Sequence, residues 1–250
     1  MDLYREFAPH PLLAGHVACL WTSRARPQGV PVRRRILPDN CIDILWQDRA
    51  PAGFVAGMMS RSHLFEADAP VLTVAVRFLP GAARAFFDLP LHLLQDDHPS
   101  LDALWPRHET DALAAALWER ELTVRARLSI IEKALLARLR LGSRLPADRL
   151  VRAAVRRIEE THGAVRIEDL ARALGVSRQH LALQFRERVG LNAKAFAMVS
   201  RFGKASHAAR TAGPGADWAA LALDCGYYDQ SHLIHEFRLL AGTTPAGFVA

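Results

Sequence analysis

The sequence predicts an α+β protein of two domains: an N-terminal small antiparallel β-barrel with helices, then an all-α domain of two tandem helix-turn-helix units. Three observations support this. From Val30 to about Phe78, short apolar runs alternate with turn residues, as in an antiparallel sheet or small barrel. After Phe78 the apolar period changes from two to about 3.6 residues, which indicates helices. The last hundred residues contain an internal repeat, which indicates a duplicated structural unit.

The β-rich part divides at its turn residues. We expect a hairpin in which Arg35–Leu37 and Cys41–Trp46 pair across the turn Pro38–Asn40. Two more strands are expected at 53–57 and 71–78, and helices at 80–88, 110–121 and 123–141. The last helix has an apolar stripe that either packs on its own domain or forms a homodimer: Leu128, Ile131, Leu135, Leu136 and Leu139.

A domain boundary is predicted at 141–146, where a glycine suited to a helix C-terminus is followed by a proline that can restart a helix. The N-terminal domain then spans 1–142 and the second domain 147–250.

Composition limits the function classes. The chain has 32 basic and 26 acidic residues, and 150–250 holds 13 basic and 9 acidic ones, so a polyanionic partner is permitted. Three scattered cysteines indicate neither a disulfide framework nor a zinc site. No apolar run reaches the roughly 18 residues of a membrane span. We expect a cytoplasmic protein with no membrane partner, no cofactor and no metal.

The repeat is visible residue by residue. Leu170–Gly175 matches Leu221–Gly226 at an offset of 51, and one inserted residue shifts the offset to 52. At that offset the matches are Ser177 with Asp229, His180-Leu181 with His232-Leu233, Phe185-Arg186 with Phe237-Arg238, Gly190 with Gly242, and Phe196 with Phe248. The two units span about 167–190 and 218–242.

Each copy has the residues that a helix-turn-helix needs. An alanine four residues before a glycine allows two helices to approach closely, and the glycine permits a left-handed turn. Ser177 or Asp229 then caps the next helix. Arginine can pair with guanine and glutamine with adenine in the major groove. The outward positions that we expect to contact DNA are Ser177, Arg178, Gln179, Ala182 and Arg186 in the first copy, and Gln230, Ser231 and His235 in the second.

A long helix is expected between the copies, from Ala193 to Arg210. It would hold the two reading helices apart, and a separation of about 34 Å would place them in successive major grooves. Its basic residues, Lys194, Arg201 and Lys204, are candidate phosphate contacts, and the alternative is a solvated helix face.

Two segments resemble the AraC/XylS family of transcription regulators: Ile167 to Phe185, and Gly226 to Pro245 with its glycine-aromatic turn and closing Gly-x-Thr-Pro. The resemblance covers about 150–250. It implies seven helices, double-stranded DNA as partner, RNA polymerase as a further candidate partner, and an N-terminal sensing or dimerising domain. Ala182 and Leu183 are short or apolar where many relatives have larger polar groups, so we expect the second helix to carry more of the base reading. Activator and repressor roles stay open, although activator is the role we expect.

Leu37 to Trp46 and Val76 to Gly81 resemble segments of a poorly characterised cupin-like group. That resemblance implies a small barrel with a pocket for a small-molecule effector. Candidate ligands of the effector are Arg35, Trp46 and Arg77. The alternative is that the tryptophan belongs to the core and that an arginine forms a structural ion pair with Asp43.

Two other function classes were weighed. A cupin-like barrel could hold a catalytic metal, but His63 and Glu66 point to opposite faces of a strand, so we expect no enzyme. A helix-turn-helix adaptor that binds protein in place of specific DNA is the main alternative. The cations Arg178, Arg186, Arg188 and Lys194 argue for DNA.

Overall fold

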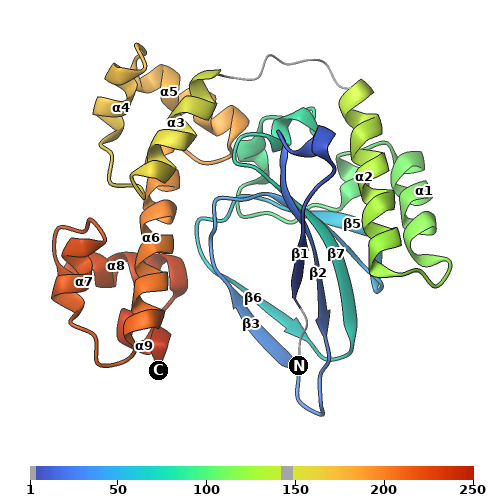
Figure 1. The fold of residues 1–250 in the computed structure, drawn as a ribbon, viewed down its shortest axis with the longest axis horizontal. Coiled ribbons are helices and arrows are strands. Elements are labelled where there is room, and N and C mark those ends of the chain that lie inside the picture. The colour runs from blue at the N-terminus through green and yellow to red at the C-terminus, as the bar shows by residue number, and fades with distance from the viewer. Residues whose placement is uncertain (1–3, 142–148) are drawn as a thin grey trace.

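The computed structural model describes residues 4–141 and 149–250, and it consists of two antiparallel sheets followed by helices (Figure 1). The larger sheet has the strand order β1-β2-β7-β4-β5, and the smaller one pairs β3 with β6. The α+β prediction is confirmed. These pairings make two separate sheets, so closure into a barrel stays a prediction. The strands are β1 Arg5–Phe7, β2 Val17–Ala25, β3 Val32–Ile36, β4 Asp43–Gln47, β5 Ala50–Ala56, β6 His63–Ala67 and β7 Val71–Phe78.

Alternation along β7 separates two faces of the larger sheet. Val74, Val76 and Phe78 are fully buried in the main core, where Phe78 packs on Phe86. Arg77 points to the opposite face, as the two-residue period of a strand requires. The sheet therefore has an apolar core face and a second face that carries charge.

The predicted hairpin is wrong. β3 pairs with β6, so Ile36 lies opposite His63, while β4 pairs with β5 and β7. The reason is burial: β4 presents Ile44 and Trp46 to the core, whereas β3 is rich in arginine and largely exposed. Pro38–Asn40 crosses between the sheets, and Asn40 adopts a left-handed conformation with φ 61°.

The helix predicted at 80–88 is also wrong, because only Ala83–Ala85 forms a short 3-10 helix. Gly81 has φ +78°, which an α-helix does not accommodate. Phe86 and Phe87 are both buried, so the apolar spacing reflects a compact loop and not one helix face. The strand β2 was not predicted. The other two predicted helices are confirmed as α1 (Arg107–Trp118) and α2 (Val124–Leu141).

The apolar stripe of α2 packs within the chain. Leu128, Ile131 and Leu135 are 0–5% exposed and belong to the main core. These three residues follow the intramolecular alternative, whereas Leu136 and Leu139 are half-buried beside them. The predicted domain boundary falls on 142–148, which lies outside the described residues.

The C-terminal part is helical, as predicted, with the long helix α6 between two pairs of shorter helices (Figure 1). Within 149–250 the structure has seven helices, the number that the family resemblance implied. Over the described ranges, no helix is both long and apolar enough to cross a membrane. The helices are α3 Arg149–Glu160, α4 Ile167–Ala173, α5 Arg178–Arg188, α6 Ala193–Ala212, α7 Trp218–Asp224, α8 Gln230–Ala241 and α9 Pro245–Val249.

The N-terminal domain contacts both helix pairs. The α5–α6 turn packs on it through Gly190, where an added Cβ would meet Met58 and the Leu91 carbonyl at about 3 Å. Arg35 of β3 donates a hydrogen bond to the carbonyl of Ala241 at the end of α8. The N-terminal domain therefore packs against the first helix pair, α4–α5, and is hydrogen-bonded to the C-terminal end of α8 in the second pair.

The crossing loop is attached to α6. The buried amide of Asn40 donates hydrogen bonds to the carbonyl of Phe196 and to Ser200 Oγ, both at 2.9 Å. The left-handed backbone directs this side chain at the helix. The crossing loop is therefore anchored to α6 by two hydrogen bonds.

Asn40→Gly is expected to loosen α6 without straining the loop, because glycine accepts the left-handed backbone and removes both hydrogen bonds. We expect the opening free energy of the α6 amides near Ser200 to fall by about 1–3 kcal/mol in hydrogen exchange. Asp111→Asn on the exposed surface of α1 is the control. Unchanged exchange in Asn40→Gly would show that the loop does not stabilise the helix.

Candidate nucleic-acid interface

The two helix turns have the same backbone geometry. The amide of Val176 donates to the carbonyl of Ala171 at 3.1 Å, and the amide of Tyr227 donates to that of Ala222 at 2.9 Å. The glycine before each donor is left-handed, with φ +69° at Gly175 and +83° at Gly226. The repeat seen in the sequence is therefore a structural duplication of α4–α5 in α7–α8.

Each second helix of a pair begins with a side-chain cap. Ser177 Oγ accepts from the amide of His180 at 3.1 Å, and Asp229 Oδ1 accepts from that of His232 at 2.7 Å. Both caps have extended backbone, so the chain enters α5 and α8 sharply. The predicted contact Ser177 thus has a capping role in the structure.

Aromatic pairs repeat as well. The rings of Phe185 and Phe196 lie 5.8 Å apart at 76°, and those of Phe237 and Phe248 lie 5.5 Å apart, also at 76°. In addition, Phe202 packs on Phe237 at 5.1 Å. Since Phe196 and Phe202 both belong to α6, this helix is packed against α5 through one ring and against α8 through the other.

The predicted reading residues lie on the outer faces of α5 and α8. Leu181 and Phe185, like Leu233 and Phe237, are fully buried and form the inward stripes. Ala182 is half-buried between them and the surface. The exposed members of the predicted set are Arg178, Gln179, Arg186, Gln230, Ser231 and His235.

The cations of α6 differ from one another. Lys194 is exposed at the start of the helix. Lys204 is exposed too, but its Nζ donates to the carbonyl of Asp224 at 2.5 Å, at the end of α7. Lys194 therefore points to solvent, whereas Lys204 is bonded to the end of α7. The two lysines do not form one set of phosphate contacts.

Arg201, predicted as a phosphate contact, lies inside the fold. Its side chain is 16% exposed and forms an ion pair with Glu236, whose side chain is 5% exposed. Its guanidinium also stacks on the ring of Tyr227 at 5.0 Å, and His232 Nε2 lies 3.2 Å from the same carboxylate. Burial raises the pKa of Tyr227, which keeps its hydroxyl protonated. This cluster, formed by Arg201, Tyr227, His232 and Glu236, joins α6 to the turn and to α8.

The predicted effector ligands do not converge on a pocket. Trp46 is fully buried in the core of the sheet domain. Arg35 is bonded to α8, as described above. Arg77 bridges Asp39 and Asp43 at 3.1 Å each, and Trp21 Nε1 donates to Asp43 at 2.9 Å. Trp46 therefore belongs to the core, and Arg77 forms a structural ion pair with Asp43, as the alternative to an effector site supposed.

Asp43 makes stability depend on pH. Burial raises its pKa to about 6, although Arg77 and Trp21 favour the charged form. An acid whose pKa is higher in the folded state stabilises the fold below its unfolded pKa, near 3.8. That contribution is lost as pH rises through about 6.

We therefore expect the free energy of unfolding of the wild type, relative to Asp43→Asn, to fall by up to about 3 kcal/mol between pH 4 and pH 6.5. Urea unfolding at several pH values measures it. Asp111→Asn, on an exposed face, is expected to follow the wild type at every pH. Parallel profiles for wild type and Asp43→Asn would contradict this.

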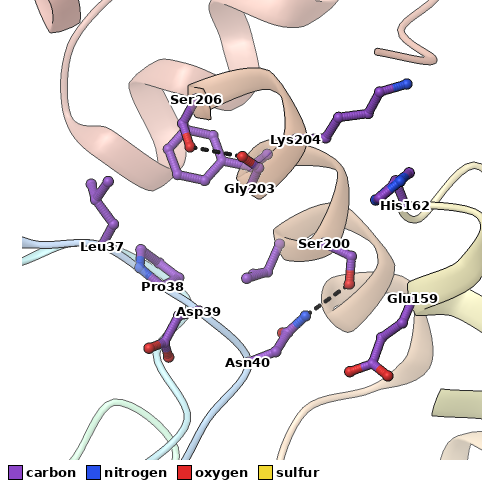
Figure 2. A pocket seen from close by; sticks show the side chains of 12 residues that line it. Leu37, Pro38, Asp39, Asn40, Glu159, His162, Ser200, Gly203, Lys204 and Ser206 are labelled. Atoms are coloured by element: carbon purple, nitrogen blue, oxygen red, sulfur yellow. Dashed lines mark hydrogen bonds between the residues drawn. The ribbon is translucent and has the colours of Figure 1, made fainter. Parts of the chain in front are cut away.

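A cleft lies between the crossing loop and the helical domain (Figure 2). It has a volume of about 460 Å³ and is lined by both domains. Figure 2 shows Asn40 bonded to Ser200 at its edge, with Glu159 and His162 on the side of α3. Burial raises the pKa of Glu159. The cleft is the hollow that a ligand could use to touch both domains, and the sequence did not indicate it.

The structure also exposes one aromatic residue that sequence reasoning passed over. Tyr228, in the turn before α8, is 87% exposed. The signal was present in the sequence as the single residue inserted in the second copy.

Comparisons with known proteins agree with this geometry. Residues 170–250 match the family described as a helix-turn-helix domain, and residues 5–100 match a domain of unknown function, DUF6597. The chain has the DNA-binding helix-turn-helix class of fold in its C-terminal domain. More particularly, the match assigns residues 170–250 to a helix-turn-helix domain of the AraC type, a type found in DNA-binding transcription regulators.

Solved structures give a more distant likeness. ToxT from Vibrio cholerae is 11% identical, with 92% of this chain and 97% of that chain covered and a TM-score of 0.47. ToxT from Vibrio cholerae O395 bound to (E)-4-(8-methylnaphthalen-1-yl)but-3-enoic acid is 10% identical, with 91% and 96% covered and a TM-score of 0.48. A search of the curated proteins found no significant match.

Proposed function

We propose that the protein reads two successive major grooves on one face of duplex DNA, one with α5 and one with α8. The observation that carries this proposal is the duplicated unit, in which α5 packs on α6 through Phe185 and Phe196 and α8 packs on α6 through Phe237 and Phe202. A rigid helix between two reading helices fixes their separation, and half-sites one helical turn apart suit such a protein.

The residues divide by role. Arg178 and Gln179 follow the cap of α5 and are placed to read base edges, with Arg186 about two turns on. Gln230 and Ser231 have the same positions at the start of α8, and His235 lies about one turn further on. Ala182 offers a small apolar contact to a thymine methyl group. Lys194 contacts phosphate, whereas Arg201 joins α6 to α8 through its ion pair with Glu236.

The two reading surfaces differ in charge. The first has two exposed arginines, Arg178 and Arg186, whereas the second has one, Arg238, beside its predicted glutamine, serine and histidine. Since cations that neutralise phosphates release counterions, we expect the first unit to contribute more of the salt dependence of binding than the second.

Equilibrium binding to labelled duplex DNA, measured between 50 and 200 mM salt, tests this proposal. Binding that weakens linearly in log Kd against log salt supports a DNA reader. No binding at low salt, together with a pull-down of a protein partner through the same helix faces, would favour the adaptor alternative.

A small-molecule effector also belongs to this proposal, and the cleft between the domains is where we place it. A ligand there would touch the loop 37–40 and α6 together, and α6 sets the relation between the two reading helices. We also propose that the protein forms a homodimer and contacts RNA polymerase. Its place of action under this proposal is the cytoplasm. Leu128, Ile131 and Leu135 of α2 are excluded from the dimer surface, because they are buried within the chain.

A further inference from the structure

The second helix-turn-helix unit contains one residue that the first lacks. Val176 and Tyr227 are equivalent, because each donates its amide to the alanine five residues earlier. One residue later the first unit already has its cap, Ser177, but the second has Tyr228 before its cap Asp229. Tyr228 is therefore the insertion.

The inserted side chain projects into solvent. Tyr227 is 3% exposed, while Tyr228 is 87% exposed, which is the largest exposed fraction among the large hydrophobic residues of the described chain. The amide of Tyr228 lies 3.4 Å from His232 Nδ1, so the turn that holds it is attached to the first turn of α8. The exposed side chain thus belongs to the residue directly before the cap of the reading helix.

Position and chemistry together suggest its partner. The residues at the start of a reading helix enter the groove, and the turn before them runs along its edge, where the phosphates lie. Tyrosine is one of the neutral side chains that donate hydrogen bonds to DNA phosphates. The carboxylate of Asp229 is turned to the amide of His232, inside the helix.

Resting on the proposed function, we infer that Tyr228 is a neutral phosphate anchor, whose hydroxyl donates to the DNA backbone at the edge of the groove read by α8. The first unit has no counterpart of this residue. This hydrogen bond fixes how deeply α8 enters the major groove, and it adds no charge to the interface. A neutral donor releases no counterion, so its contribution does not depend on salt.

The test uses the full-length protein and duplexes that the wild type selects from a random pool. Tyr228→Phe removes only the hydroxyl, and we expect about tenfold weaker binding with an unchanged salt slope and an unchanged selected motif. Tyr228→Lys is expected to regain affinity at low salt and to steepen the slope by about 0.9, the amount for one neutralised phosphate. Tyr4→Phe, in the N-terminal domain, is the matched control and is expected to bind as the wild type does.

Two results would overturn the inference while leaving the proposed function intact. Tyr228→Phe could bind within twofold of the wild type, or it could change the preferred base at one position, which would make Tyr228 a base reader. If the wild type selects no duplex, the proposed function itself fails. These failures are distinguishable because the wild-type selection is done first.

Discussion

Arg201→Ala is expected to destabilise the helical domain by about 3–5 kcal/mol, because it leaves the carboxylate of Glu236 buried without its cation. The stacking on Tyr227 is lost as well. Urea unfolding followed by circular dichroism measures the effect. Lys204→Ala on the same helix is the control, since its side chain is exposed, and we expect a change below about 1 kcal/mol.

A second variant separates the buried ion pair from a DNA contact. Arg201→Ala combined with Glu236→Gln removes the uncompensated charge, so the pair of changes is expected to cost less than Arg201→Ala alone. An Arg201→Ala protein of wild-type stability that binds DNA with a shallower salt slope would instead make Arg201 a phosphate contact, as the sequence suggested.

Arg178→Ala and Gln230→Ala are each expected to weaken binding to the selected duplex by about 10- to 100-fold, the range for one bidentate base contact. The effects are expected to be local. Arg178→Ala relaxes the preference at one half-site and Gln230→Ala at the other, because the two helices enter different grooves. Selection and sequencing with each variant measures both.

Arg156→Ala is the matched control for charge, since Arg156 is an exposed arginine of α3 outside the reading helices. It is expected to leave both half-sites unchanged. If Arg178→Ala lowers affinity for every duplex equally and leaves the motif intact, Arg178 contacts phosphate and reads no base.

The helical domain could be predicted well from the sequence because its signals are local. A cap such as Ser177 or Asp229, and a stripe such as Leu181 with Phe185, act within one or two helix turns. The repeat then supplied an independent check, since Phe196 and Phe248 were matched by offset alone and have the same ring geometry in the structure.

The sheet domain was predicted less well because strand pairing is not local. Cys41–Trp46 is adjacent in sequence to Arg35–Leu37, but β4 pairs with β7, about thirty residues away. Turn residues at Pro38–Asn40 fit a hairpin and a crossing loop equally, and only the position of the other strands decides between them. The same limit applies to 80–88, where tertiary packing of Phe86 and Phe87 overrides helical spacing.

Individual site residues show a related limit. Arg201 and Lys194 are both cations on the expected linker helix, and nothing in the local sequence separates them. Glu236, which takes Arg201 out of the candidate interface, lies thirty-five residues further along the chain. The same holds for Arg35 and Ala241, whose contact joins the two domains.

The central claim is that α5 and α8 read two grooves of the same duplex, and selection of bound DNA from a random pool by the full-length protein tests it most directly. Sequencing the bound fraction is predicted to recover a bipartite motif whose half-sites are centred about 10–10.5 base pairs apart. A single half-site, or two half-sites with freely varying spacing, would contradict the claim, because α6 would then not hold the two helices in one register.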